Sequence, residues 1–323
     1  QGIDTTKKFK DELAGYRSQL AESYLTDKGV SEELVKEAYE RMKYDVHASH
    51  ILILSRPDDM PEDTLKAFKK ALELMNRAKA GEDFAKLAKE NSEDPSAKQN
   101  GGDLGFFSAL RMVYPFENAA FNTKVGEISQ PFRTRFGYHI VKIYDQRKSR
   151  GERTIAHIMV NTKPGDSLAE NAETRINEIY KKLQQGEDFE SLAKQFSEDT
   201  SSAGKGGLLA PFSAGQLSSQ EFEDAAFDLE NIGDVTTPVK TQYGWHILKL
   251  YDKQPVKPFS DLRPELEMKV KRDERSRLID DALVSKLKVK YDVSTNQKAL
   301  DYFASILNED YFKHTWKLPE NFK

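Results

Sequence analysis

The stretch ASHILIL at residues 48–54 decides the fold, because the chain returns to it as IAHIMV at 155–160. Working outward, the blocks that follow also occur twice and in the same order. They are GEDFAKLAKENSED at 81–94 and GEDFESLAKQFSED at 186–199, PFENAAF at 115–121 and EFEDAAF at 221–227, and TRFGYHIVKIYD at 134–145 and TQYGWHILKLYD at 241–252. An internal repeat of about 100 residues predicts two copies of one small domain.

The spacing between the two copies is nearly constant. His50 and His157 lie 107 residues apart, as do His139 and His246, and the blocks between them lie 105 or 106 residues apart. Small length changes between matching blocks are typical of loops in a duplicated fold. The chain has 6 histidines, so most of them fall at just two equivalent positions.

Each copy predicts the same order of elements. A short β-branched strand (51–54 and 155–160) precedes a helix that ends at Gly81 or Gly186, a second short helix, a Gly-Gly turn, a third short helix and two closing strands. Strands and helices mix without a regular βαβ alternation, which indicates an α+β fold. We expect a small antiparallel four-stranded sheet with surrounding helices in each copy, over residues 46–149 and 152–253.

Helical segments are predicted on both sides of the repeats. Residues 1–45 carry two apolar stripes at helical spacing, and Ser31 is the predicted N-cap of the second helix. Residues 254–323 predict a long helix capped by Ser260, a short strand over 287–293 and a final helix. Since neither flank is large enough for a good core, we expect the two flanks to pack on each other as a separate module.

The composition excludes several classes of protein. Lys and Arg number 49 against 53 Asp and Glu, so no basic excess indicates nucleic acid. No apolar run approaches the roughly 18–20 residues that span a bilayer. The chain has 0 Cys, which excludes a thiol nucleophile, a disulfide scaffold and Cys-bound zinc.

The compartment follows from weaker signals. A chain without Cys fits an oxidising envelope compartment, where stray thiols are a liability. No secretory h-region opens the sequence, so we expect either a cytosolic protein or a mature protein whose signal peptide has been removed. The abrupt end over 316–323 suggests a fragment of a longer protein.

The ordered motifs resemble those of the parvulin-type peptidyl-prolyl cis-trans isomerases. The HIL strand, the S-x-D loop, the GGDLG turn, the PFE helix and the T-x-x-G-x-H strand follow one another at the spacing of that family, over roughly 47–146 and 153–253. The wider layout resembles the SurA and PrsA group of envelope foldases, in which parvulin domains are carried on a helical chaperone module.

The resemblance implies a function and a setting. The protein would catalyse X-Pro bond rotation in unfolded or extended client proteins and assist their folding in the periplasm or cell envelope. Its partners would be proline-containing polypeptides, among them outer-membrane or secreted proteins. Neither a cofactor nor a metal ion is expected.

The resemblance also assigns a site to each copy. The polar network of copy one comprises His50, Asp94, Thr134 and His139, and its apolar cup comprises Leu104, Met112 and Phe116. The polar network of copy two comprises His157, Asp199, Thr241 and His246, and its cup comprises Leu209, Leu217 and Phe222.

The chemistry explains why these residue types suit the reaction. Rotation about an X-Pro bond must cross a barrier of about 18–20 kcal/mol that amide resonance sets. The catalyst must hold the proline ring, exclude water and favour the twisted amide over the planar one. By resemblance, Asp94 lies near the rotating carbonyl and Thr134 orients one imidazole. Paired imidazoles can share a proton and fix each other's tautomers, so we expect them to hold the site together rather than transfer protons.

Copy two departs from the family pattern around its cup. The turn GGDLG at 101–105 becomes GGLLA at 206–210, and Pro115 is replaced by Glu221. The loop before the third helix is also one residue longer. Because the polar network is unchanged, these differences concern the shape of the cup, and we predict that copy one is the faster isomerase.

Simpler interpretations stay open. A buried His is often only a satisfied core residue, the apolar residues of the cup can be ordinary core, an Asp before Pro95 can cap a turn, and the Gly pairs suit positive-φ turns. The alternative function is a non-catalytic holdase chaperone that uses the same pockets to bind unfolded polypeptides. A structural adaptor built from inactive repeats is a third alternative, which the retained histidine pairs disfavour.

Overall fold

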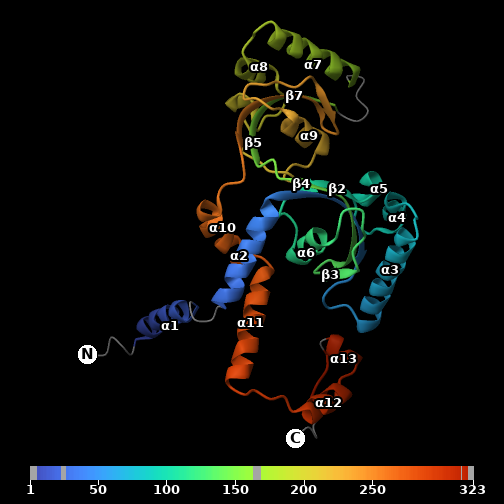
Figure 1. Ribbon diagram of the computed structural model, residues 1–323, viewed down its shortest axis with the longest axis vertical. Coiled ribbons are helices and arrows are strands. Elements are labelled where there is room, and N and C mark those ends of the chain that lie inside the picture. The colour runs from blue at the N-terminus through green and yellow to red at the C-terminus, as the bar shows by residue number, and fades with distance from the viewer. Residues whose placement is uncertain (1–5, 23–26, 163–168, 314, 319–323) are drawn as a thin grey trace.

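The computed structural model of this protein describes residues 6–22, 27–162, 169–313 and 315–318. Two units, each built around a small sheet, follow one another along the long axis (Figure 1). Helices from both flanks of the chain lie together beside the first unit. Within the described ranges, no helix has both the length and the apolar character of a membrane span.

The first unit contains a four-stranded antiparallel sheet in the order β2-β1-β4-β3. Its α+β class and strand number confirm the prediction for this copy. The strands are β1 (Tyr44–Leu54), β2 (Asp103–Phe107), β3 (Phe132–Thr134) and β4 (Gly137–Lys148), and the helices are α3 (Pro61–Lys79), α4 (Phe84–Asn91), α5 (Ala97–Asn100) and α6 (Tyr114–Asn122).

The second unit repeats this plan with one strand fewer, in the order β5-β7-β6. The strands are β5 (Glu152–Asn161), β6 (Val239–Thr241) and β7 (Gly244–Gln254), and the helices are α7 (Ala169–Gln184), α8 (Phe189–Phe196), the 3₁₀ turn η2 (Ala203–Lys205) and α9 (Gln220–Asp228). The prediction of four strands therefore holds for copy one and not for copy two. Leu208 and Phe212 contact β5 only through isolated bridges, because Pro211 between them has no N–H to donate to a ladder.

Each sheet is covered by helices on both faces. In the first unit, one face packs against α3 and α4 around Leu74 and Phe84, and the other packs against α6 around Phe107 and Phe116. The second unit has the same two clusters. Side chains alternate between the two faces of a strand, so the register of β1 and β4 decides which residues meet α6.

Glycine is required where the Gly-Gly turn crosses the histidine strand. Gly102 adopts φ 78°, and a Cβ built on it would lie 2.2 Å from the carbonyl oxygen of His50. Gly207 has the same 2.2 Å relation to the carbonyl oxygen of His157. These close approaches hold the loop that follows the candidate aspartate against the strand that carries the candidate histidine.

Helices from the two flanks form one module, which is α2 (Lys28–Met42), α10 (Phe259–Arg272) and α11 (Arg275–Lys290). Their shared core is Leu34, Val35, Ala38, Leu266, Val270 and Ile279. The prediction that the flanks pack on each other is thus confirmed. The module is not separate, however, because Leu110 and Tyr114 of the first unit pack against the same core. The remaining helices are α1 (Lys7–Glu22), α12 (Gln297–Ile306) and α13 (Glu309–Phe312).

The predicted helix caps of the flanks are wrong in both cases. The N-cap of α2 is Asp27, whose carboxylate accepts hydrogen bonds from the N–H groups of Gly29 and Val30, and Ser31 lies within the helix. The predicted long C-terminal helix begins after Pro258 and is interrupted at Asp273, where the backbone is extended. Part of the first predicted stripe, at 23–26, lies outside the described residues.

The predicted strand over 287–293 is also wrong. Helix α11 continues to Lys290, and Asp292 adopts φ 49°, which no extended strand allows. The alternation that suggested a strand leaves Val289 and Val293 exposed. An alternating pattern predicts a strand only where a partner strand and a core can cover one face.

Candidate active site

The two histidines of copy one meet on the α6 face of the first sheet. His50 lies on β1 and His139 on β4, and the register pairs Leu52 with His139, so the two imidazoles are diagonal neighbours on one face. Their Nδ1 atoms are 3.4 Å apart and their rings are stacked with centroids 5.7 Å apart. Both side chains are buried.

Asp94 and Thr134 close the two ends of this pair. The Oδ2 atom of Asp94, in the loop after α4, lies 2.7 Å from Nε2 of His50. The Oγ1 atom of Thr134, at the end of β3, lies 2.8 Å from Nε2 of His139. The other carboxylate oxygen of Asp94 accepts hydrogen bonds from the N–H and the hydroxyl of Ser96.

One arrangement of protons satisfies every contact with both imidazoles neutral. Thr134 donates its hydroxyl proton to Nε2 of His139, His139 donates from Nδ1 to Nδ1 of His50, and His50 donates from Nε2 to the carboxylate of Asp94. Each imidazole then acts once as a donor and once as an acceptor, as a neutral ring requires. The network is a continuous chain that ends on an anion.

The pKa values agree with that arrangement. Burial, together with the neighbouring His50, lowers the pKa of His139 to about 3, so this ring is neutral near pH 7. The hydrogen bond from His50 holds the pKa of Asp94 well below its usual range, so this carboxyl is ionised. The site therefore contains a partly exposed carboxylate and a buried, uncharged imidazole.

The cup lies directly against the imidazoles. The ring of Phe116 meets His50 and His139 edge to face, with centroids 5.5 and 5.6 Å apart. Leu104 and Met112 are partly buried and pack against the cluster that contains Phe116. All seven residues assigned to copy one are thus brought together.

Copy two assembles its matching residues in the same way. The Nδ1 atoms of His157 and His246 are 3.3 Å apart, Asp199 Oδ2 lies 2.8 Å from His157 and Thr241 Oγ1 lies 2.9 Å from His246. The Phe222 ring meets the two imidazoles edge to face at 5.4 and 5.1 Å. The partly buried members of this cup are Leu209 and Leu217.

The pKa shifts of copy two follow the same causes. Burial and the neighbouring His157 lower the pKa of His246 to about 4. Burial also lowers the pKa of His157, although the hydrogen bond that His157 donates to Asp199 acts to raise it. Burial would raise the pKa of Asp199, but hydrogen bonds from Ser202, His157 and Ser201 bring it well below its usual range.

Sequence reasoning missed one contributor in each copy. Phe132 stacks on His139 with ring centroids 5.5 Å apart; it lies two residues before Thr134 on β3, an alternation that signals a shared face. In copy two, Ser202 contacts both His157, at 3.1 Å, and Asp199. Copy one has Ala97 at that position, so comparing the two copies position by position could have revealed the extra hydroxyl.

In the described ranges no group of three or more His, Cys, Asp or Glu side chains is placed to hold a metal ion.

Comparisons with known proteins place this arrangement in a family. Two family models, each described as a PPIC-type PPIASE domain, match residues 33–148 and 157–252. The chain is 31% identical over 243 residues to the chaperone SurA of Pseudomonas syringae, covering 73% of this chain and 55% of that protein. It is 33% identical over 238 residues to the chaperone SurA of Legionella pneumophila, covering 68% and 54%.

A solved structure completes the comparison. The peptidylprolyl isomerase PrsA of Bacillus anthracis is 23% identical, and the match covers 83% of this chain and 98% of that one with a TM-score of 0.31. The chain spans about half the length of the SurA relatives it matches. It belongs to the PPIC-type, or parvulin, family of peptidyl-prolyl isomerase domains, of which it carries two in tandem, and it is homologous to the SurA chaperones.

Proposed function

We propose that this protein is a peptidyl-prolyl cis-trans isomerase that acts on X-Pro bonds of unfolded or extended polypeptides, with one site in each parvulin domain. The observation that carries the proposal is the paired network: in both copies an ionised Asp, two stacked imidazoles and a Thr form one hydrogen-bonded chain beside a buried Phe. A purely binding pocket would need only the apolar part.

The proposed catalysis is differential binding of a twisted amide. The pyrrolidine ring of the substrate enters the cup lined by Leu104, Met112 and Phe116, where water is excluded. Amide resonance places negative charge on the carbonyl oxygen of the planar form, and twisting removes that charge. An anionic Asp94 close to this oxygen therefore destabilises the planar form more than the transition state.

In this proposal the histidines are positioning groups. His50 fixes the orientation of Asp94 through the 2.7 Å hydrogen bond, and His139 and Thr134 fix the tautomer of His50. No proton needs to leave the network during rotation. The stacked imidazoles also form one wall of the cup, since the ring of Phe116 contacts both.

The setting we propose is the periplasm or cell envelope. The SurA relatives carry the name chaperone, and a chain with 0 Cys suits an oxidising compartment. The clients we propose are unfolded envelope proteins, including outer-membrane or secreted proteins, whose folding slow X-Pro isomerisation can limit.

A second candidate is a holdase chaperone. One observation favours it: several large hydrophobic side chains are exposed, among them Leu13 and Tyr16 on α1 and Leu300 and Tyr302 on α12. Such surface can hold an unfolded segment without turnover. The two functions are compatible, because the exposed residues lie outside both cups.

The experiment that tests the proposal is a proline-tetrapeptide isomerisation assay on the full chain. His50→Ala silences copy one and His157→Ala silences copy two, and the double variant should lose at least about 100-fold in kcat/KM while still suppressing aggregation of an unfolded client. If the wild-type chain suppresses aggregation but does not accelerate isomerisation, the holdase function replaces the proposal.

A further inference from the structure

A buried carboxylate joins the first cup to the helical module. Glu117 follows Phe116 on α6, and its side chain has no exposed surface. Its Oε1 atom pairs with Nη1 of Arg41, from α2, at 3.1 Å and with Nη2 of Arg275, from α11. Its Oε2 atom accepts a hydrogen bond of 2.6 Å from the N–H of Leu110. One carboxylate thus contacts both the module and the first parvulin domain.

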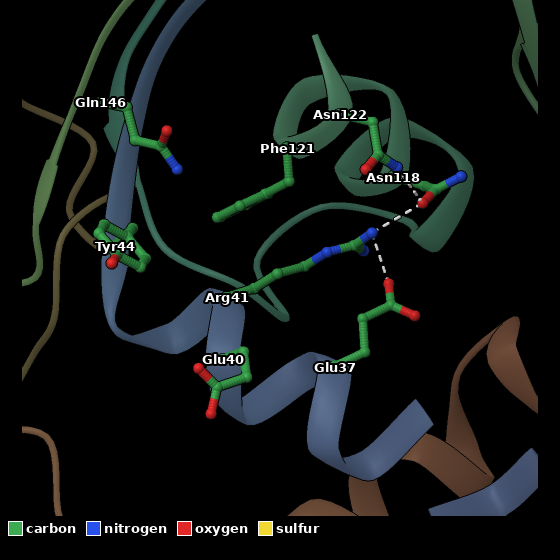
Figure 2. A pocket seen from close by; sticks show the side chains of 8 residues that line it. All are labelled: Glu37, Glu40, Arg41, Tyr44, Asn118, Phe121, Asn122 and Gln146. Carbon is green, nitrogen blue, oxygen red and sulfur yellow. Dashed lines mark hydrogen bonds and ion pairs between the residues drawn. The ribbon is translucent and has the colours of Figure 1, made fainter. Parts of the chain in front are cut away.

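Arg41 is fixed from both sides of this junction. Figure 2 shows its side chain reaching from α2 toward α6, with bonds to Glu37 on its own helix and to Asn118 opposite. Its guanidinium lies 5.6 Å from the ring centroid of Phe121. A pocket of about 430 Å³ opens beside these residues. Because the arginine has partners on both helices, it transmits the position of α2 to α6.

The loop that Glu117 holds is part of the cup. Residues 108–113 contain both Leu110 and the cup residue Met112. Leu110 adopts φ 64°, a left-handed conformation that is unfavourable for a residue other than glycine. Its side chain packs against the core of the helical module. The loop therefore has the module on one side and the proline cup on the other, and contact with the module offsets its strain.

Copy two provides a natural comparison. Gly215 matches Leu110 in sequence and also has a positive φ, of 78°, which glycine adopts without strain. Glu223 matches Glu117 and accepts hydrogen bonds from the N–H groups of Gly215, at 2.8 Å, and Leu217, at 3.3 Å. In the described part of the chain no arginine pairs with Glu223. Both copies thus share the hydrogen bond from the loop to the buried glutamate, whereas the ion pairs with Arg41 and Arg275 are found at Glu117 of copy one.

We propose that Arg41 and Arg275 are positioning residues for the first site: through Glu117 they set the loop that carries Met112, so the helical module controls the shape of the first cup. This inference rests on the function proposed above. A movement of α11 relative to α6 would change proline binding in copy one alone.

The test compares one substitution in two single-site chains. Arg275→Met is made in the His157→Ala chain, where only copy one works, and in the His50→Ala chain, where only copy two works. We expect kcat/KM for a proline tetrapeptide to fall at least about fivefold in the first chain, mainly through KM, and to stay unchanged in the second. Arg277→Met, an exposed residue of the same helix, is the matched control and should change neither.

Two results would overturn the inference. One is an unchanged copy-one activity in a folded Arg275→Met chain, and the other is an equal loss in both single-site chains, which indicates general destabilisation. Should Arg275→Met alone fail to fold, Arg275→Met with Glu117→Gln removes the orphaned buried charge and keeps an acceptor for Leu110.

A second readout does not depend on catalysis. The ¹³C-methyl NMR signal of Met112 should shift in Arg275→Met and stay in place in Arg277→Met. An inactive wild-type chain would refute the proposed function, and this signal would then still decide whether the module sets the shape of the cup. If the Met112 signal has the same position in Arg275→Met as in Arg277→Met, the proposed effect of Arg275 on the loop that carries Met112 is refuted.

Discussion

The two parvulin domains build one polar network in two different surroundings. Each pair of matching contacts differs by only 0.1 Å: 3.4 and 3.3 Å between the imidazoles, 2.7 and 2.8 Å to the aspartate, and 2.8 and 2.9 Å to the threonine. The rims of the cups differ more. Copy one has Asp103, a complete β2 and a loop that packs on the helical module. Copy two has Leu208, isolated bridges and a loop whose Gly215 lies against Phe107 of copy one.

This comparison separates two kinds of determinant. The network depends on strand register and on turns held by glycine, which both copies retain. The rim depends on what each loop contacts. In the first domain Leu110 packs on the helical module and Glu117 pairs with Arg41 of α2 and Arg275 of α11, whereas Gly215 of the second domain lies against Phe107. The duplicated domains therefore share one polar network, while the elements that surround each domain change the rim of its cup.

Loss of the central aromatic ring should have the largest effect. Phe116→Ala and Phe222→Ala each remove a buried ring and should destabilise their own domain by about 3–5 kcal/mol. The effect should be larger in copy one, because Phe116 also contacts the rings of Phe107 and Phe132. Hydrogen exchange of β4 and β7 amides measures each domain separately, and a larger loss from Phe222→Ala would contradict the comparison.

Acid should destabilise both domains. The pKa of His139 is about 3 in the folded chain, below the 6.5 of an unfolded histidine, so the unfolded state binds its proton first as the pH falls. The contribution of His139 to the free energy of unfolding is fully present above pH 6.5 and is lost as the pH falls toward 3. At pH 4 this loss amounts to about 3 kcal/mol. The pKa of His246 is about 4, so the second domain should lose stability in the same way, but its loss should level off near pH 4 instead of pH 3.

Hydrogen exchange at pH 7, 5 and 4 measures this loss. In His139→Ala the slope for the first domain should be shallower, while the second domain keeps its own slope. Equal protection of β4 amides at pH 7 and pH 4 in the wild-type chain would show that the buried imidazole is not held neutral.

The additional hydroxyl of copy two should have a smaller effect. Ser202→Ala removes a buried group that contacts both Asp199 and His157, and we expect the second domain to lose about 1 kcal/mol. Ser201→Ala removes a more exposed donor to the same carboxylate and should cost less. Exchange protection of β5 amides checks both, and a larger effect from Ser201→Ala would rule out the buried hydroxyl as the added support.

The smallest effect should come from the exposed rim of copy one. Asp103→Leu removes a contact of 2.9 Å with Nε2 of His47, in which both side chains are partly exposed, so the stability should fall by only about 0.5 kcal/mol. Because the change copies Leu208, the activity of the His157→Ala chain should move toward that of copy two. An unchanged activity would exclude this rim position as a cause of the difference.

Much of this architecture could be predicted from the sequence, because its signals are local or repeated. The helix ends at Gly81 and Gly186 have φ values of 102° and 91°, as a glycine after a helix should. The histidine pairs followed from the family resemblance of the repeated motifs.

The features that could not be predicted are long-range or depend on what covers a pattern. Glu117 and Arg275 are 158 positions apart, and nothing local indicates their contact. Pro211 interrupts the fourth strand of copy two because it faces β5 and has no N–H to donate to the ladder, and the sequence does not show which strand it faces. The alternation over 287–293 is typical of a strand, but without a facing strand those residues extend α11 and then turn.

The central claim is that both networks favour a twisted prolyl amide and that the rim makes copy one the faster catalyst. The most direct measurement is kcat/KM for one proline tetrapeptide with the His157→Ala chain and the His50→Ala chain under the same conditions. The account predicts measurable isomerisation by both, with the His157→Ala chain faster. A faster His50→Ala chain, or two chains as inactive as the double variant, would contradict it.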